Sequence, residues 1–198
     1  MTATLRSVAC GPVELRLMTP RVAQELFVLA RDPDVSTYLS WPAHETIEDS
    51  LRFIHDARAL WERRLAWLPG IFEAEGGRLV GCIGVSGIDR ANARAEVGTW
   101  LGAAHQGQGF NVPAKSAMLA AAFGELELRR LELLVRIDND RSLQAVRGLP
   151  GMRDEGVQGE RIVQQGVAYD AHAFALLRSE FRVEAWPTAT VNVGSPSL

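Results

Sequence analysis

The sequence predicts an α/β protein of the α+β kind, in which helices flank a mixed, largely antiparallel central sheet of about seven strands. Strand candidates at 65–75, 78–87 and 94–101 are separated by short turns, which favours an antiparallel meander. A helix beginning near Val112 separates the last of them from an alternating apolar strand at 131–137. Because a whole helix intervenes, those two strands can lie parallel.

The first part of the chain predicts a hairpin followed by two helices. Strands at 4–9 and 13–18 flank a Cys-Gly-Pro turn. A helix over about residues 19–32 has Thr at its cap, Pro at its first position and Asp-Pro at its end. The pattern Thr46-Ile47-Glu48-Asp49 resembles a capping box and begins a second helix that continues to about Arg64.

The connection between these helices carries Trp41 and His44. A loop with both side chains could line the mouth of a substrate site. The alternative is equally compatible with the sequence: Trp41 packs the two helices together and His44 is solvated.

A glycine-rich junction follows the strand that ends at Leu101. Gly107 and Gly109 permit a close backbone approach, and Pro113 stands where the first turn of a helix should be. The free N–H groups of a helix start form a pocket for phosphate or diphosphate. The alternative is that the two glycines simply make a tight turn.

The last part of the chain predicts a short helix and two strands. Asn139 begins the helix, which ends at Pro150-Gly151, and strands follow at 152–163 and 169–182. Residues 186–198 are rich in Thr, Ser, Gly and Pro and read as a loose tail. With 198 residues, 47% of them apolar, the chain predicts one domain over residues 1–185.

Composition narrows the class of protein. The net charge of −3 argues against a nucleic-acid partner, and no apolar stretch approaches the length of a membrane span. Cys10 and Cys82 do not suggest a disulfide framework, and the start of the chain lacks the features of a secretion signal. A cytoplasmic protein without membrane or nucleic-acid partners is therefore expected.

Three motifs follow one another along the chain: 95–101 (Ala-Glu-Val-Gly-Thr-Trp-Leu), 106–111 (Gln-Gly-Gln-Gly-Phe-Asn) and 138–142 (Asp-Asn-Asp-Arg-Ser). Their order and spacing resemble the GNAT acetyltransferase superfamily, and most closely its RimJ/RimL-type N-acetyltransferase branch. The resemblance covers roughly residues 13–181, and the branch acetylates protein N-termini and a range of small amines.

The resemblance implies a GNAT fold, in which a splayed pair of parallel strands holds acetyl-CoA as co-substrate, and implies no metal. The four histidines are scattered and neither cysteine has a ligand partner at usable spacing, which also argues against a metal site. The family pattern places Trp41 and His44 around the acceptor. The residues expected at the cofactor are Trp100, Leu101, Gln106, Gly107, Gln108, Gly109, Phe110, Asn111, Asn139 and Ser142.

Two catalytic roles follow from the resemblance. Glu96 corresponds to the general base of histone-acetylating relatives, and direct transfer needs a base because an amine at neutral pH is mostly protonated. Ser142 is expected to donate a hydrogen bond to the departing sulfur, with Tyr169 as a reserve acid. The alternatives are that Glu96 is an ordinary polar strand residue, that Glu155 serves as base, and that Ser142 merely follows the Asn139 cap.

The chain departs from the family pattern at two places. Asn111 replaces the last Gly or Ala of the diphosphate loop, and an Asn there followed by a Lys four residues on, here Lys115, is a variation within the branch. Pro150 is inserted before the glycine that usually follows the helix directly, which affects the expected geometry at the pantetheine end.

Other functions are ranked lower. The segment Gly109 to Ser116 is one residue from the nucleotide-binding pattern G-x-x-x-x-G-K-[ST], but Pro113 indicates that the helix begins before Lys115. A relative that binds acetyl-CoA without transferring the acetyl group is a further alternative. The favoured function is direct acetyl transfer to a primary amine, on a protein N-terminus or a small molecule. Dimers occur in this branch, so a homodimer is a possible state.

Overall fold

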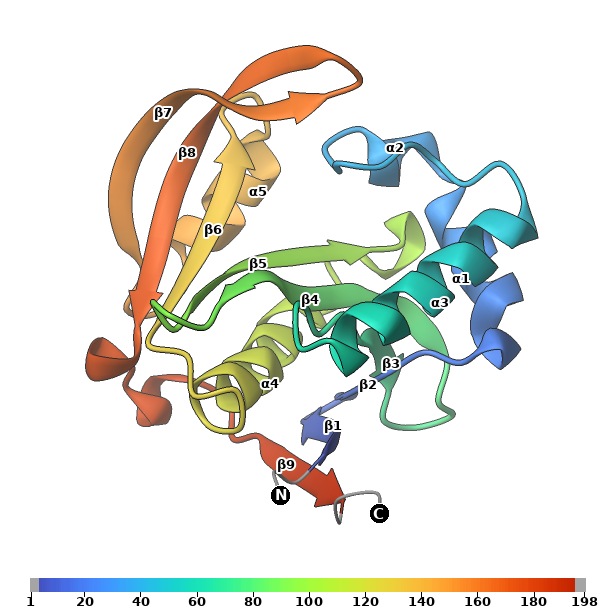
Figure 1. Cartoon of the computed structure of the whole chain (residues 1–198), viewed down its shortest axis with the longest axis horizontal. Helices are drawn as coiled ribbons and strands as arrows, with labels where there is room; N and C mark the ends of the chain where they lie inside the picture. The colour runs from blue at the N-terminus through green and yellow to red at the C-terminus, as the bar shows by residue number, and fades with distance from the viewer. Residues whose placement is uncertain (1–3, 195–198) are drawn as a thin grey trace.

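One twisted sheet organises the structure, in the strand order β7-β8-β6-β5-β4-β3-β2-β1-β9 (Figure 1). The computed structural model describes residues 4–194, and nine strands lie among them. Within that range every neighbouring pair is antiparallel except β5 and β6. The strands are β1 Thr4–Cys10, β2 Val13–Arg16, β3 Gly70–Glu73, β4 Leu79–Asp89, β5 Arg94–Leu101, β6 Arg130–Arg136, β7 Arg153–Gln164, β8 Val167–Leu177 and β9 Thr190–Gly194.

Helices cover the sheet and form two apolar clusters with it. One cluster contains residues of α4 and α5 with Trp61 of α3, and the other contains residues of α1 with Ile54 of α3. The β3 neighbours Ile71 and Phe72 point into different clusters because side chains alternate along a strand. The helices are α1 Ala23–Ala30, α2 Pro33–Ser36, α3 Ile47–Glu62, α4 Asn111–Phe123 and α5 Asp140–Arg147, with short 3-10 turns at Pro20–Val22, Ala103–His105, Arg178–Glu180 and Val183–Ala185. No helix within residues 4–194 has the length and hydropathy to cross a membrane.

The helix starts were predicted well because their signals are local. Thr46 and Asp49 form the capping box of α3, and the Asn139 side chain accepts the Ser142 N–H at the start of α5. The helix expected over 19–32 differs in detail: it opens as a 3-10 turn and becomes α1 only at Ala23. Asp32 then caps α2, a short helix within the predicted connection.

Three strand predictions need correction. The strand expected at 169–182 is β8, which ends at Leu177 and is followed by the 3-10 turn Arg178–Glu180. Of the strand expected at 65–75, only Gly70–Glu73 belongs to the sheet, and Trp67 makes an isolated bridge to Val85. The segment expected to be a loose tail contains β9, which pairs antiparallel with β1. Pairing with a distant strand leaves little trace in composition, which explains the error. Residues 195–198 of that predicted tail lie outside the described residues.

Candidate functional site

The site is organised by the one parallel strand pair found among the described residues. The β5–β6 pairing covers only Arg94–Glu96 with Arg130–Glu132, although β5 continues to Leu101 and β6 to Arg136. Beyond these residues the two strands diverge (Figure 1). The splayed pair expected from the sequence is therefore present. A register shift lies between Ser86 and Asp89 of β4, opposite the paired end of β5, so the bulge is on the neighbouring strand.

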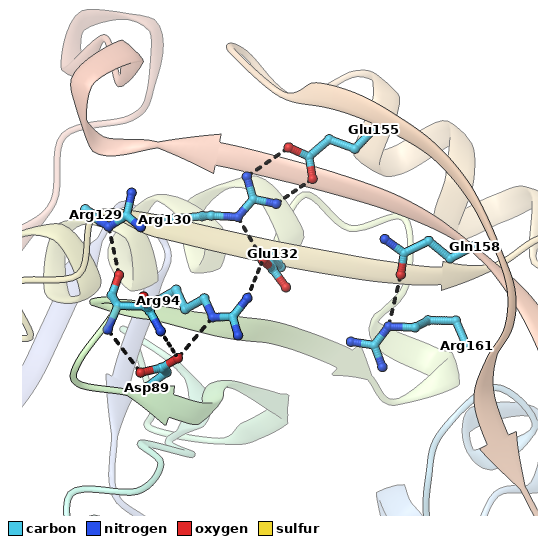
Figure 2. Close-up of polar contacts among 9 residues, drawn as sticks. Asp89, Arg94, Arg129, Arg130, Glu132, Glu155, Gln158 and Arg161 are labelled. Atoms are coloured by element: carbon cyan, nitrogen blue, oxygen red, sulfur yellow. Dashed lines mark hydrogen bonds and ion pairs between the residues drawn. The ribbon is translucent and has the colours of Figure 1, made fainter.

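A network of ion pairs surrounds the paired end of these strands (Figure 2). Arg94 Nη1 of β5 lies 3.8 Å from Glu132 Oε1 of β6, and the same carboxylate lies 2.8 Å from Arg130 Nε on its own strand. Arg94 Nε also lies 3.2 Å from Asp89 Oδ2 of β4. Arg130 also binds both carboxylate oxygens of Glu155 on β7. The hydrogen bond from Arg130 lowers the pKa of Glu155. Glu155, an alternative base in the sequence analysis, is thus occupied in a structural ion pair.

The start of α4 has, among the described residues, no side chain that caps its main-chain N–H groups. Phe110 is its N-cap residue and supplies no side-chain hydrogen bond, and the first turn has no acidic residue. By contrast, side chains cap both α3 and α5. Gly107 and Gly109 have φ of 76° and 85°, and a Cβ at either would meet no atom within 4 Å. The first-turn N–H groups therefore face an open, glycine-lined loop, which fits a diphosphate.

The side chain of Gln106 lies between this loop and α5. Its Nε2 donates to the Leu101 carbonyl at 3.0 Å, and its Oε1 accepts from Arg141. The side-chain amide of this residue, which was expected at the cofactor, is therefore engaged within the protein. The contact instead brings the exposed guanidinium of Arg141 beside the loop. Gln108 donates from Nε2 to the Ala104 carbonyl at 2.6 Å, so its side-chain amide is engaged within the protein as well.

Main-chain donors at the end of β5 face two ways. The N–H of Gly102 donates to Val80 of β4 at 3.0 Å. Because hydrogen-bonding groups alternate along a strand, the N–H of Leu101 points to the opposite edge, where β6 has diverged. Leu101, rather than Gly102, is thus the donor directed toward the space that a pantetheine arm would enter.

Glu96, Gly98 and Trp100 share one face of β5, while Ala95 and Val97 point into the core. Glu96 is half-buried, and burial raises the pKa of its carboxyl; Glu132 raises it further and Arg161 opposes the rise. A Cβ on Gly98 would meet no atom within 4 Å. Space is therefore open between a carboxylate with a raised pKa and the indole of Trp100.

Trp41 meets Trp100 at the far end of this space, and His44 lies on the Trp41 ring. The Trp41 ring lies 5.6 Å from Trp100 and 5.2 Å from His44, and Phe53 of α3 completes the aromatic group. His44 Nδ1 is 2.8 Å from the Oγ of Ser50, and burial lowers the pKa of His44. Both residues that the sequence analysis placed at the acceptor thus lie beside β5, and Trp41 also packs against helix residues of the second apolar cluster.

Arg136 joins the α2 region to the β7–β8 hairpin. Its guanidinium lies 3.5 Å from the centre of the Tyr169 ring and 5.0 Å from that of Tyr38. It donates to the Thr37 carbonyl at 3.4 Å and to the side chain of Gln164, which in turn donates to Leu39. Tyr169, the reserve acid, is therefore packed under a cation. Through these contacts Arg136 holds the α2 region and the β7–β8 hairpin together on one side of the space above β5 and β6.

At the start of α5, Asn139 Oδ1 accepts the Ser142 N–H at 3.1 Å. Among residues 4–194 the Ser142 hydroxyl has no hydrogen-bond partner. Asn139 thus acts as the cap, and the Ser142 Oγ–H remains available as a donor.

The nucleotide-binding alternative is not supported. Lys115 lies in the second turn of α4 and is buried, with its Nζ bonded to Thr99 and Asn111. It does not stand at the mouth of the loop, where a phosphate-binding Lys is needed. Within the described part of the chain, no three His, Cys, Asp or Glu side chains are grouped to hold a metal ion.

Residues 13–149 match the family model described as "Acetyltransferase (GNAT) domain". The chain belongs to the GNAT acetyltransferase family. Its family marks it as an acyltransferase that uses acetyl-CoA, in agreement with the uncapped helix start and the diverging strands described above.

Similar proteins carry related names. The Escherichia coli ribosomal-protein-serine acetyltransferase is 34% identical over 54% of this chain and 59% of that protein. The uncharacterized N-acetyltransferase p20 of Bacillus licheniformis is 28% identical over 84% of this chain and 93% of its own length. The microcin C7 self-immunity acetyltransferase MccE, solved with acetyl-CoA and AMP, superposes with a TM-score of 0.75 at 25% identity, covering 84% of this chain and 93% of that one.

Three residues of the candidate site escaped the sequence analysis. Gly98 lay within the recognised strand motif, and its position between two same-face residues of interest could have identified it. Arg141 lay between the predicted cap and Ser142. Arg136 gave no signal, because its partners Thr37 and Gln164 are 99 and 28 residues away in the sequence.

Proposed function

We propose that this GNAT protein transfers the acetyl group of acetyl-CoA directly to a primary amine, on a protein N-terminus or a small molecule, with Glu96 as general base. The observation that carries the proposal is the placement of Glu96. It lies at the last paired position of β5, on the face that holds the open space over Gly98.

The diphosphate would lie on the loop from Gly107 to Asn111. The main-chain N–H groups there and the positive end of the α4 dipole favour an anion. Arg141, held beside the loop by Gln106, adds a positive charge within reach. The pantetheine arm would then run between β5 and β6, where their pairing has ended.

Glu96 would accept the proton that the amine releases as its nitrogen attacks the thioester carbonyl carbon. A carboxyl whose pKa is raised by burial is a better base than an exposed one, because its conjugate acid is closer to neutrality. The Leu101 N–H would donate to the carbonyl oxygen, on which negative charge develops. When the carbon–sulfur bond breaks, the free hydroxyl of Ser142 would donate to the departing sulfur.

The acceptor amine would enter between Glu96 and the aromatic group of Trp41, His44 and Trp100. Aromatic rings and a carboxylate together suit an amine on an apolar stem. Because the E. coli relative is named for a serine of ribosomal protein, an amine panel should include peptides that begin with serine beside small aliphatic and aromatic amines.

Ligand-induced stabilisation tests the donor. At a concentration of about 100 times its Kd, acetyl-CoA should stabilise the protein by roughly 2.7 kcal/mol, and Mg-ATP should not. Release of free thiol across the amine panel then tests transfer. Stabilisation by Mg-ATP alone would overturn the donor assignment. Binding of acetyl-CoA without thiol release for any amine would favour the non-catalytic alternative.

A further inference from the structure

Lys115 is the chain's one lysine, and its charge is buried beneath the diphosphate loop. The side chain is 8% exposed. Its Nζ donates to Thr99 Oγ1 at 3.1 Å and to Asn111 Oδ1 at 2.9 Å. Thr99 precedes the glycine loop and Asn111 follows it, so the ammonium joins the two ends of the loop. Both of these acceptors are neutral oxygens.

Within residues 4–194, no carboxylate lies in ion-pair contact with this ammonium. On α4 itself Lys115 is the only ionisable side chain. The elements packed around α4 carry other ionisable groups: Arg6 and Cys10 on β1, Glu14 and Arg16 on β2, Cys82 and Asp89 on β4, Arg94 and Glu96 on β5, and His105 before the loop. Glu14 and Asp89 are paired with Arg16 and Arg94.

A buried and unpaired ammonium destabilises the folded chain. Accordingly, burial lowers the pKa of Lys115 to about 8. The helix start adds positive partial charge at the same place, and its first turn contains no acidic residue. The loop region of the free protein therefore holds more positive charge than the protein compensates.

We propose that Lys115 is a positioning residue for the cofactor, whose buried charge finds its counter-ion only when a diphosphate binds to the loop above it. The inference rests on the proposed acetyl-CoA site. Binding of acetyl-CoA and protonation of Lys115 are therefore coupled. Lys115 acts through its charge and through its hydrogen bond to Asn111, and it does not touch the reacting atoms.

The sign of the coupling is fixed. A bound anion favours the charged form and raises the pKa of Lys115 above its value in the free protein. The bound protein then holds more protons than the free protein, so affinity is highest below about pH 8 and falls as pH rises toward the pKa of the complex. Each unit by which binding raises this pKa corresponds to about a ten-fold change in Kd.

Calorimetric titration with acetyl-CoA tests the coupling. Kd should rise about ten-fold between about pH 7 and about pH 9.5, with proton uptake visible as a dependence of the heat on buffer ionisation. The phosphates of acetyl-CoA do not titrate in this range, since the second pKa of a phosphate monoester is about 6. Thiol chemistry of free CoA is avoided by using the acetylated form.

The variants Lys115→Met and Lys115→Gln remove the charge, and Gln keeps a hydrogen-bonding side chain. Both should bind acetyl-CoA about ten-fold more weakly near pH 7, without the proton uptake of the unmodified protein. Thr99→Val keeps the charge and should keep the pH dependence. All other ionisable groups remain in these variants, so the difference between profiles isolates Lys115.

Two results would overturn the proposal: Lys115→Gln binding with the affinity and pH profile of the unmodified protein, or the unmodified protein binding without proton uptake. If Lys115→Met does not fold, the affinity of Lys115→Gln and the proton uptake of the unmodified protein still test the proposal. Failure of the unmodified protein to bind acetyl-CoA at any pH would instead contradict the proposed function.

Discussion

At the scale of single residues, Glu96 has two properties that separate a base from an ordinary strand carboxylate. It borders open space on its own face of β5, and burial holds the pKa of its carboxyl above the ordinary value. Its neighbour Glu132 shares that face but is neutralised by Arg130 and Arg94. The two neighbouring carboxylates therefore have different electrostatic surroundings, set by their partners.

Replacing Glu96 with Gln should lower kcat for acetyl transfer by about 10²-fold while acetyl-CoA binding is nearly unchanged. The variant should not lose stability. Because its native pKa is raised, Glu96 contributes fully to folding stability below its unfolded-state pKa, and this contribution is lost as pH rises through the native value, so it is absent at pH 7. Steady-state kinetics and thermal unfolding at pH 7 check both. An unchanged rate would remove Glu96 from the mechanism.

Glu132→Gln is the matched control on the same face. Removing this carboxylate removes one cause of the raised Glu96 pKa and leaves Arg130 without one of its partners. Most of the activity should remain, and the acid limb of the pH–rate profile should move to lower pH, because the base loses its proton earlier. If the acid limb does not move, it reflects the titration of a group other than Glu96.

At the scale of secondary-structure elements, two residues at the start of α5 are expected to differ in role, one structural and the other chemical. Asn139 is the cap and Ser142 contributes a free hydroxyl. Ser142→Ala should lower kcat by about ten-fold or more with little change in unfolding free energy, since one hydrogen bond to a charged sulfur is lost. Asn139→Ala should cost about 1 kcal/mol of stability through the lost cap. Paired kinetic and denaturation measurements distinguish them; equal stability losses would contradict the assignment.

Strand β5 presents Gly98 where a side chain would enter the acceptor space. Its φ is not in the left-handed region and its missing Cβ has no neighbour within 4 Å, so a larger residue is sterically allowed in the free protein. Gly98→Val should preserve folding and acetyl-CoA binding yet lower kcat/KM for the amine by about ten- to a hundred-fold, because it fills that space. Gly98→Ala should show a smaller effect. Unimpaired transfer by the Val variant would place the acceptor elsewhere.

At the scale of the whole molecule, sequence reasoning succeeded where the signal was local. Caps at Thr46 and Asn139, the glycine loop and the parallel crossover between β5 and β6 are each specified within short segments. It failed where partners are distant. Arg136 donates to Thr37, which directly follows α2, and to Gln164 of β7. Strand β9, near the end of the chain, pairs with β1 near its start. Such contacts depend on the packed fold, which no single window of residues records.

The C-terminal segment provides the sharpest test of that difference. Trp186 is 6% exposed within the main apolar cluster, and the next carbonyl, that of Pro187, accepts the Ser116 hydroxyl of α4 at 2.5 Å. Thr190–Gly194 then covers the outer edge of β1. Trp186→Ala should cost about 3–5 kcal/mol, since it empties a packed site. A chain that ends at Pro187 keeps Trp186 and should lose only about 1–3 kcal/mol, because it gives up one short, half-exposed strand.

Urea denaturation of the full chain and both variants measures the ranking. A structural segment predicts a lower midpoint for both variants, with the Trp186 change the more severe. A loose tail, as the composition alone suggested, predicts that the shortened chain unfolds at the midpoint of the full one. The midpoint of the shortened chain therefore measures how much the residues after Pro187 stabilise the folded domain, since both chains retain Trp186.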